Sequence, residues 1–286
     1  MEPKSLEAVE FRDGQRRQWN SAAGGWRKWS ELIDRVGGGI SRRLVELAGV
    51  GPGNRVLDVA AGYGEPSLTA ARRVGAEGGV VASDISAEMI AFGRERAAAA
   101  GLENVEFVES AAASLSFPEA SFDAALSRWG IIFEPEGEAA AARIRTFLKP
   151  GARMAISSWA SPERVPFLAI PMQTAMQRLG VPPPPPGTPG PLSRPTPEAL
   201  GGLLEGAGFS DVEVEDAEVN FEWQSLEEFT AFIKETAAPL TAMIAPHPQA
   251  VQEETWAAIA EAVREAAGDA REVRLSNLSL LAVGRA

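Results

Sequence analysis

The sequence contains no cysteine and only one histidine, His247, among its 286 residues. Without cysteine the chain can form no disulfide, no thiolate nucleophile and no zinc–thiolate site, and one histidine cannot build a multi-histidine metal centre. A magnesium ion bound by carboxylates stays open, but no motif marks one. We therefore predict no metal site.

Basic clusters and long apolar runs are also missing. Lys and Arg total 27 against 39 Asp and Glu, which gives a net charge of −12, and no Lys/Arg-rich run offers the clustered positive charge that nucleic acids attract. No stretch approaches the roughly 20 apolar residues that span a bilayer, and the first residues lack the apolar core of a signal peptide. We expect a cytoplasmic protein with no nucleic-acid partner and no membrane span. No pattern indicates its oligomeric state.

Short apolar runs alternate with alanine-rich helical stretches between Arg55 and Trp159, a pattern typical of a parallel sheet covered by helices. The expected strands are 55–60, 79–84, 105–110, 122–127 and 153–159. Two later alternating segments, 211–223 and 272–286, are expected to pair as an antiparallel hairpin. The sequence therefore predicts an α/β fold.

The remaining segments divide the chain into a core and its additions. We expect an N-terminal helical lid at 1–36, a core at 37–160, and a helix with a proline-rich connector at 161–197. Segments 198–222 and 271–286 would complete the core, and 223–270 would form a helical substrate cap. Within the lid, Gly24 and Gly25 are expected to break the helix that carries Trp19, Trp26 and Trp29.

The segment RVLDVAAGYGEPS carries the clearest chemical signal. An apolar strand delivers Asp58 at its carboxyl end, and a turn of small residues then runs directly into a helix. Small residues let a ligand approach the backbone, glycine permits positive φ, and free N–H groups at the helix N-terminus suit a carboxylate. Twenty residues after Gly64, Asp84 closes the next strand, where it can accept hydrogen bonds from two ribose hydroxyls.

These residues resemble the class I S-adenosylmethionine (SAM)-dependent methyltransferases of the type 11 group, which includes the quinone C-methyltransferases. The family's D-x-G-x-G-x-G loop is matched by Asp58, Ala60, Gly62 and Gly64, with alanine in place of the first glycine. Asp84 matches the family's ribose-binding acid. The resemblance is closest over 54–160 and weaker over 198–222 and 271–286. It implies SAM as cofactor and a Rossmann-like, doubly wound, seven-stranded sheet, mostly parallel with the last strand antiparallel, with helical lid insertions.

The resemblance also implies a set of site residues. Those expected at the cofactor are Asp58, Ala60, Gly62, Gly64, Asp84, Ile85, Ala111, Ala112, Ser127, Trp19 and Trp29. Those expected at the substrate are Tyr63, Arg128 and Trp129, although Tyr63 could equally pack without lining the pocket. One departure matters, because many relatives carry an acid at the position of Ala111 to accept the adenine amino group. The backbone of Ala111 and Ala112 could hold adenine instead, and Ser110 or Ser114 could substitute.

The roles of two residue types stay open. His247, in the segment APHPQ, is the one side chain with an ordinary pKa near neutrality, which makes it a candidate general base, although a surface-loop histidine is the simpler interpretation. The seven tryptophans could fill the core, form an aromatic wall facing the substrate, or box a cationic nitrogen.

We predict a methyltransferase acting by in-line displacement on a small, partly apolar acceptor that is lipid-like, quinone-like or a natural product. Such a reaction needs alignment and exclusion of water, and needs neither a metal nor a catalytic triad. One alternative is an NAD(P)-dependent oxidoreductase, whose G-x-G-x-x-G fingerprint would require glycine at position 67, where this chain has Ser67. Another is a SAM-binding module without catalytic activity.

Overall fold

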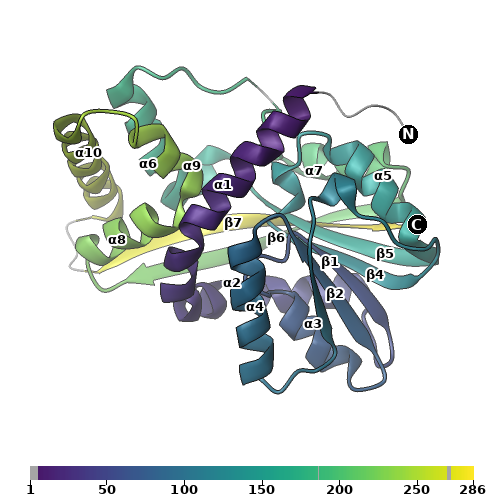
Figure 1. Cartoon of the computed structure of the whole chain (residues 1–286). Helices are drawn as coiled ribbons and strands as arrows, with labels where there is room; N and C mark the ends of the chain where they lie inside the picture. Colours follow the sequence, from purple (N-terminus) through teal and green to yellow (C-terminus); the bar gives the residue numbers. More distant parts are fainter. Residues whose placement is uncertain (1–5, 186, 269–271) are drawn as a thin grey trace.

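A seven-stranded sheet forms the centre of the molecule in the computed structural model, which describes residues 6–185, 187–268 and 272–286 (Figure 1). The strands are β1 (Arg55–Val59), β2 (Gly79–Asp84), β3 (Val105–Glu109), β4 (Phe122–Arg128), β5 (Leu148–Trp159), β6 (Ser210–Trp223) and β7 (Val273–Arg285). Their order is β3-β2-β1-β4-β5-β7-β6. The pairings among β1 to β5 are parallel, whereas β7 runs antiparallel to both neighbours. The predicted doubly wound sheet and its hairpin are confirmed.

Ten α-helices are described, and several begin at residues that satisfy free backbone amides. They are α1 (Leu6–Lys28), α2 (Ser30–Leu47), α3 (Ser67–Val74), α4 (Ala87–Ala99), α5 (Gly137–Phe147), α6 (Pro166–Leu179), α7 (Pro197–Gly206), α8 (Leu226–Thr236), α9 (Ala238–Ile244) and α10 (Gln249–Ala267). Ser86, Thr196 and Ser225 cap α4, α7 and α8 by accepting hydrogen bonds from amides three residues later.

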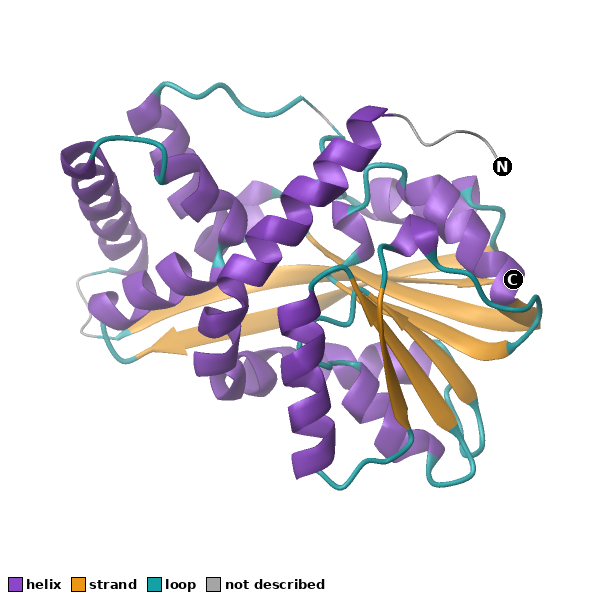
Figure 2. Cartoon of the chain, viewed as in Figure 1, coloured by secondary structure: helices purple, strands orange, loops and turns teal. Residues whose placement is uncertain are grey.

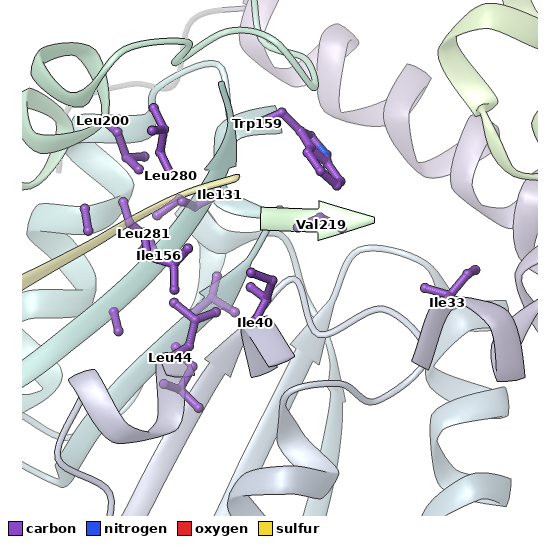
Figure 3. Close-up of a cluster of buried hydrophobic side chains, with 14 of the residues drawn as sticks. Ile33, Ile40, Leu44, Ile131, Ile156, Trp159, Leu200, Val219, Leu280 and Leu281 are labelled. Carbon is purple, nitrogen blue, oxygen red and sulfur yellow. The ribbon is translucent and has the colours of Figure 1, made fainter. Parts of the chain in front are cut away.

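Helices cover both faces of the sheet (Figure 2). On one face α2 packs against α3, β4 and β5, and on the other α7 packs against α5, β6 and β7. Figure 3 shows Ile40 and Leu44 of α2 next to Ile156 of β5, and Leu200 of α7 next to Leu280 of β7. Apolar burial on both faces holds the strands in one register, because a one-residue slip would turn every side chain to the opposite face.

β5 begins at Leu148, five residues earlier than predicted, and its pairing with β4 shifts register after Phe122, where Pro150 and Gly151 (φ +81°) interrupt the regular ladder.

The helices α8, α9 and α10 lie in the chain between β6 and β7, and α6 packs against α9 and α10. Their role as a substrate cap stays a prediction. No helix within the described ranges is long and apolar enough to cross a bilayer.

The prediction that Gly24 and Gly25 break the first helix was wrong. α1 runs unbroken through both glycines, and the chain turns at Trp29 instead. Gly25 packs so closely on the end of α8 that a Cβ at this position would lie 1.9 Å from the backbone oxygen of Glu235. Tertiary packing, which requires glycine at this position, therefore outweighs the low helix propensity of the pair.

Candidate functional site

A cavity of about 130 Å³ lies at the carboxyl ends of the central strands, beneath α1. The chain leaves β1 toward β2 and β3 on one side and returns to β4 on the other, so β1 and β4 flank the topological switch point of the sheet. Open α/β sheets bind ligands at this position. α1 contributes one wall through Arg12, Gln15, Trp19 and Trp26, and Figure 1 shows this helix crossing the sheet.

The turn after β1 lines the cavity with its backbone. Ala60 and Gly62 adopt positive φ of +57° and +54°, a conformation that costs an alanine about 1–2 kcal/mol. Space around Ala60 is tight, because a Cβ added to Gly130 would lie 2.5 Å from the Cβ of Ala60. The amide of Gly62 donates a 2.8 Å hydrogen bond to Oδ2 of Asp84. The turn is thus fixed against the end of β2 with little room for larger side chains.

Asp84 lies at the cavity wall in the position predicted for the ribose-binding acid. Its Oδ1 accepts a 2.8 Å hydrogen bond from the amide of Ser86, and burial raises its pKa to about 6, partly offset by backbone hydrogen bonds from Ser86, Gly62 and Ile85. With this pKa the carboxyl is predominantly ionised at neutral pH. A carboxylate offers about four acceptor positions, so Asp84 retains capacity for hydroxyl donors.

Asp58 lies behind the turn, is completely buried, and does not line the cavity. Oδ2 accepts a hydrogen bond from the hydroxyl of Ser67, whereas Oδ1 has no partner among the described residues. Burial raises its pKa to about 7, although the hydrogen bond from Ser67 lowers it. Ser67, which stands where a nicotinamide fingerprint needs glycine, therefore ties the first turn of α3 to β1.

The end of β4 supplies a second wall. Ser127 is buried behind the cavity, and its Oγ accepts a 2.9 Å hydrogen bond from the amide of Ile131. Trp129 lines the cavity with a φ of +52°, and its indole stacks on Trp159 at a centroid distance of 4.4 Å. The indole nitrogen of Trp129 donates to the hydroxyl of Ser279 over 2.9 Å. Stacking on one face and the hydrogen bond from the indole nitrogen thus fix this aromatic ring.

A buried hydrogen-bonded chain joins the turn to α2 and α4. Arg128 donates to the hydroxyl of Tyr63 over 3.1 Å and to that of Ser41 over 2.8 Å. The hydroxyl of Tyr63 donates to Oδ1 of Asp34 over 2.9 Å, and Asp34 also pairs with Arg96. Burial raises the pKa of Tyr63, so this hydroxyl keeps its proton. Tyr63 and Arg128 both line the cavity.

Aromatic side chains of α1 complete the enclosure. Trp19 packs edge-on against Phe133 with centroids 5.2 Å apart, and Trp26 lies 5.6 Å from the ring of Tyr63. The indole nitrogen of Trp26 donates to the backbone oxygen of Thr236 in α8 over 3.0 Å. Trp19 and Trp26 are seven positions apart, a spacing that places them on the same face of one continuous helix. The helix break that we predicted between them hid this relationship.

Most of the predicted site residues meet around this cavity. The lining includes Trp19, Ala60, Gly62, Tyr63, Asp84, Ile85, Ala111, Ala112, Arg128 and Trp129. Gly64, with Asp58 and Ser127, belongs to the layer behind it. Trp29 lies elsewhere, donating to Glu235 over 2.6 Å and packing on Phe232. His247 lies in the turn between α9 and α10, outside the lining. Their proposed roles stay predictions.

Ser110, a predicted substitute for the missing acid, lines the cavity beside Ala111 and Ala112, and the loop after β3 brings no acid to it. Sequence reasoning missed Arg12 and Glu134 in the lining. Glu134 follows the short 3-10 helix η2 (Ile131–Phe133) and pairs with Arg12. Arg12 and Glu134 are 122 positions apart, and no local motif contains either of them.

Residues 56–151 match the family model described as a methyltransferase domain. The matched segment runs from β1 into β5 and contains the turn after β1 and the end of β4, both of which line the cavity.

A curated relative, the ubiquinone/menaquinone biosynthesis C-methyltransferase UbiE of Teredinibacter turnerae, is 36% identical over 141 residues, covering 48% of this chain and 57% of that protein. The chain thus spans little more than half the length of the curated relatives it matches.

Two solved structures share the fold at low sequence identity. Phosphoethanolamine N-methyltransferase 2 of Haemonchus contortus, in complex with S-adenosyl-L-methionine, has a TM-score of 0.60 and 19% identity, covering 96% of this chain and 59% of that one. The [4+2]-cyclase SpnF has a TM-score of 0.55 and 21% identity, covering 93% and 96%. A shared fold therefore accompanies more than one kind of reaction.

Proposed function

We propose that this chain transfers a methyl group from SAM to a small, partly apolar acceptor. The observation that carries the proposal is the cavity at the switch point, where the turn Ala60–Gly62 and the carboxylate of Asp84 meet the aromatic residues of α1. The fixed backbone turn suits the amino-acid end of the cofactor, and Asp84 suits its ribose.

The residues present fit such a cofactor. An added Cβ at Gly62 meets nothing within 4 Å, so the turn leaves open space for a ligand at its backbone. Asp84 is held by two backbone amides and needs no reorganisation to accept hydroxyl donors. When bound, SAM supplies an electrophilic methyl group on a positively charged sulfur.

The chain's own contribution to the reaction is placement and exclusion of water. Trp129 and Tyr63 are fixed by stacking and hydrogen bonds, and α1 encloses the cavity. Holding an acceptor in line with the methyl group can supply several kcal/mol of the acceleration. The one histidine of the sequence, His247, does not line the cavity, and Asp84 is held by backbone amides and assigned to the ribose, so we propose an acceptor that needs no protein base or enters already deprotonated.

The acceptor class rests on the walls of the cavity and on the relatives. Trp19, Trp129, Ile131 and Phe133 give the site an apolar and aromatic lining, which favours a flat or lipid-like molecule. The curated relative is named a quinone C-methyltransferase, which supports a quinone-like acceptor. The apolar faces of α8 and α9, including Phe229, Phe232 and Leu240, are buried, and we propose that these helices border the acceptor's entrance.

Titration calorimetry with S-adenosylhomocysteine (SAH) tests the cofactor assignment. We expect binding in the micromolar range, and absence of binding at high micromolar concentration would contradict the proposal. Formation of SAH from SAM in the presence of quinone, phenol and amine acceptors then tests the reaction. Binding with no turnover across all acceptor classes would favour the module without activity. NADH binding without SAH binding would favour the oxidoreductase.

A further inference from the structure

Arg12 of α1 is a buried arginine with an incomplete set of partners. It lines the cavity and is 6% exposed. Its Nε donates to Oε1 of Glu134 over 2.8 Å, and Nη2 contacts Glu134 and donates to Oε2 of Glu136 over 2.6 Å. Nη1 is buried, and no described residue accepts a hydrogen bond from it. An unpaired buried N–H costs about 1–3 kcal/mol, so this group is poised for an acceptor that the ligand supplies.

The position of Arg12 along α1 identifies the end of the cavity that it serves. Trp26, near the other end of the helix, contacts Tyr63 in the turn after β1. Arg12 precedes Trp26 by 14 positions, which corresponds to about 21 Å along an unbroken helix. Arg12 therefore serves the end remote from the glycine-containing turn.

The helix α5 relates the loop after β3 to the partners of Arg12. Asn20, midway along α1, accepts a hydrogen bond from Ser86, so the middle of α1 lies at the end of β2. Arg143 of α5, the helix that follows Glu136, donates to the backbone oxygen of Leu115 beside η1 (Ala112–Ser114), and α5 packs against η1. The helix that follows Glu134 and Glu136 thus borders the loop after β3, and Arg12, Glu134, Ala111 and Ala112 all line the cavity.

We propose that Arg12 and Glu134 recognise the base edge of the cofactor's adenine, in place of the acid that the loop after β3 lacks. The inference rests on the proposed function. Adenine presents its amino donor N6 beside the ring-nitrogen acceptor N1, and we assign this edge to the pair. Both bonds from Arg12 to Glu134 reach Oε1, so Oε2 remains for the amino group while Nη1 of Arg12 donates to the ring nitrogen. The two acids against one arginine leave a surplus acceptor in this cluster.

Calorimetry with two ligands tests the inference by binding alone. SAH carries adenine, whereas S-inosylhomocysteine carries hypoxanthine, in which the amino donor becomes a carbonyl acceptor and the ring-nitrogen acceptor becomes a donor. Both groups of the proposed pair would then face like partners. We expect the chain to prefer SAH by at least about tenfold, the effect of one unsatisfied buried group.

Matched variants separate recognition from the ion pair. Glu134→Gln keeps the shape of the side chain but can present a donor or an acceptor, so we expect its preference for SAH to fall to within about threefold. Glu136→Gln also removes an ion pair from Arg12, yet Glu136 does not line the cavity. It should keep the full preference. Arg12→Lys retains the charge without Nη1 and should also lose preference.

The outcomes are distinct. Equal binding of both ligands to the unaltered chain, or an unchanged preference in Glu134→Gln, overturns the inference. In both cases SAH still binds, so the proposed function is not contradicted. An equal loss of preference in Glu134→Gln and Glu136→Gln also overturns it, because the ion pair alone would then explain the effect. Absence of SAH binding contradicts both the inference and the proposed function. Melting temperatures of the three variants identify any that fail to fold.

Discussion

The hydroxyl of Tyr63 accepts a 3.1 Å hydrogen bond from Arg128 and donates a 2.9 Å hydrogen bond to Asp34. Tyr63 belongs to the turn after β1, Arg128 ends β4, and Asp34 lies in α2. One phenol therefore joins the two strands at the switch point to the helix beneath them. Since Tyr63 and Arg128 both line the cavity, this bond sets its shape as well as contributing to stability.

Tyr63→Phe removes the shared hydroxyl and leaves a buried N–H of Arg128 and an oxygen of Asp34 without their partner. We expect a loss of about 1–3 kcal/mol in the free energy of unfolding, measured by urea titration, and weaker SAH binding. Ser41→Ala is the matched control, because it removes the other side-chain acceptor of Arg128 at a site away from the turn. It should lower stability without a comparable change in affinity. Unchanged stability of Tyr63→Phe would contradict the role of the hydroxyl.

The adjacent glycines of α1 give a pair of variants with opposite expected effects. Gly25→Ala places a Cβ 1.9 Å from the backbone oxygen of Glu235, whereas an added Cβ at Gly24 meets nothing within 4 Å. We expect Gly25→Ala to displace α1 from α8, lower stability by about 1–3 kcal/mol and weaken SAH binding. Gly24→Ala should raise stability by up to about 1 kcal/mol through helix propensity. Thermal melts and calorimetry measure both, and similar behaviour of the two variants would refute the packing argument.

The contact between Ala60 and Gly130 predicts a non-additive pair. Gly130→Ala introduces a Cβ 2.5 Å from that of Ala60 and should destabilise the fold and the turn after β1. Ala60→Gly removes the partner atom and relieves the strain of positive φ. We expect the double variant to recover at least about 1 kcal/mol of the stability lost in Gly130→Ala, measured as the coupling energy in a double-mutant cycle. Strict additivity would mean that the contact is relieved in another way.

Asp58 predicts a pH-dependent effect. Its pKa is raised by burial from 3.8 to about 7, so the folded chain holds this proton more tightly than the unfolded chain. The group favours folding while protonated, and this preference is lost as pH rises from about 4 to about 7. Asp58→Asn removes the titration, and its amide oxygen can still accept from Ser67 while its nitrogen replaces the unpartnered Oδ1.

We therefore expect the stability of Asp58→Asn relative to the unaltered chain to increase between pH 5 and pH 8 in urea titrations. A difference independent of pH across this range would show that Asp58 does not titrate there.

Strand positions were predictable because apolar runs, turn residues and helix caps are local signals. The segments around Asp58 and Asp84 ended strands as expected, and the antiparallel hairpin of β6 and β7 followed from alternation in both segments. The family resemblance grouped Tyr63, Arg128 and Trp129 at one site, and all three line the cavity, since the carboxyl ends of parallel strands meet at one edge.

The features that sequence could not predict depend on contacts between distant segments. Gly25 looks like a helix breaker until α8 is placed against it. Neither Arg12 nor Glu134 is distinctive within its own helical or loop segment, because each is a residue type common on surfaces. Their ion pair forms only when the fold brings the two segments together. Trp29 resembles Trp19 in sequence, yet the turn after α1 directs it to Glu235 and Phe232.

Helix α1 has different neighbours on its two sides. Trp26 contacts Tyr63 at the cavity with its ring, and its indole nitrogen donates to Thr236 at the end of α8. A ligand that holds α1 in place at the cavity also holds the surface that α8 packs against. By thermodynamic linkage, a ligand that binds the cavity more tightly when α1 is packed on α8 stabilises that packing by the same free energy. The proposed cofactor would then hold α1 against α8, and its release would loosen the contact between the two helices.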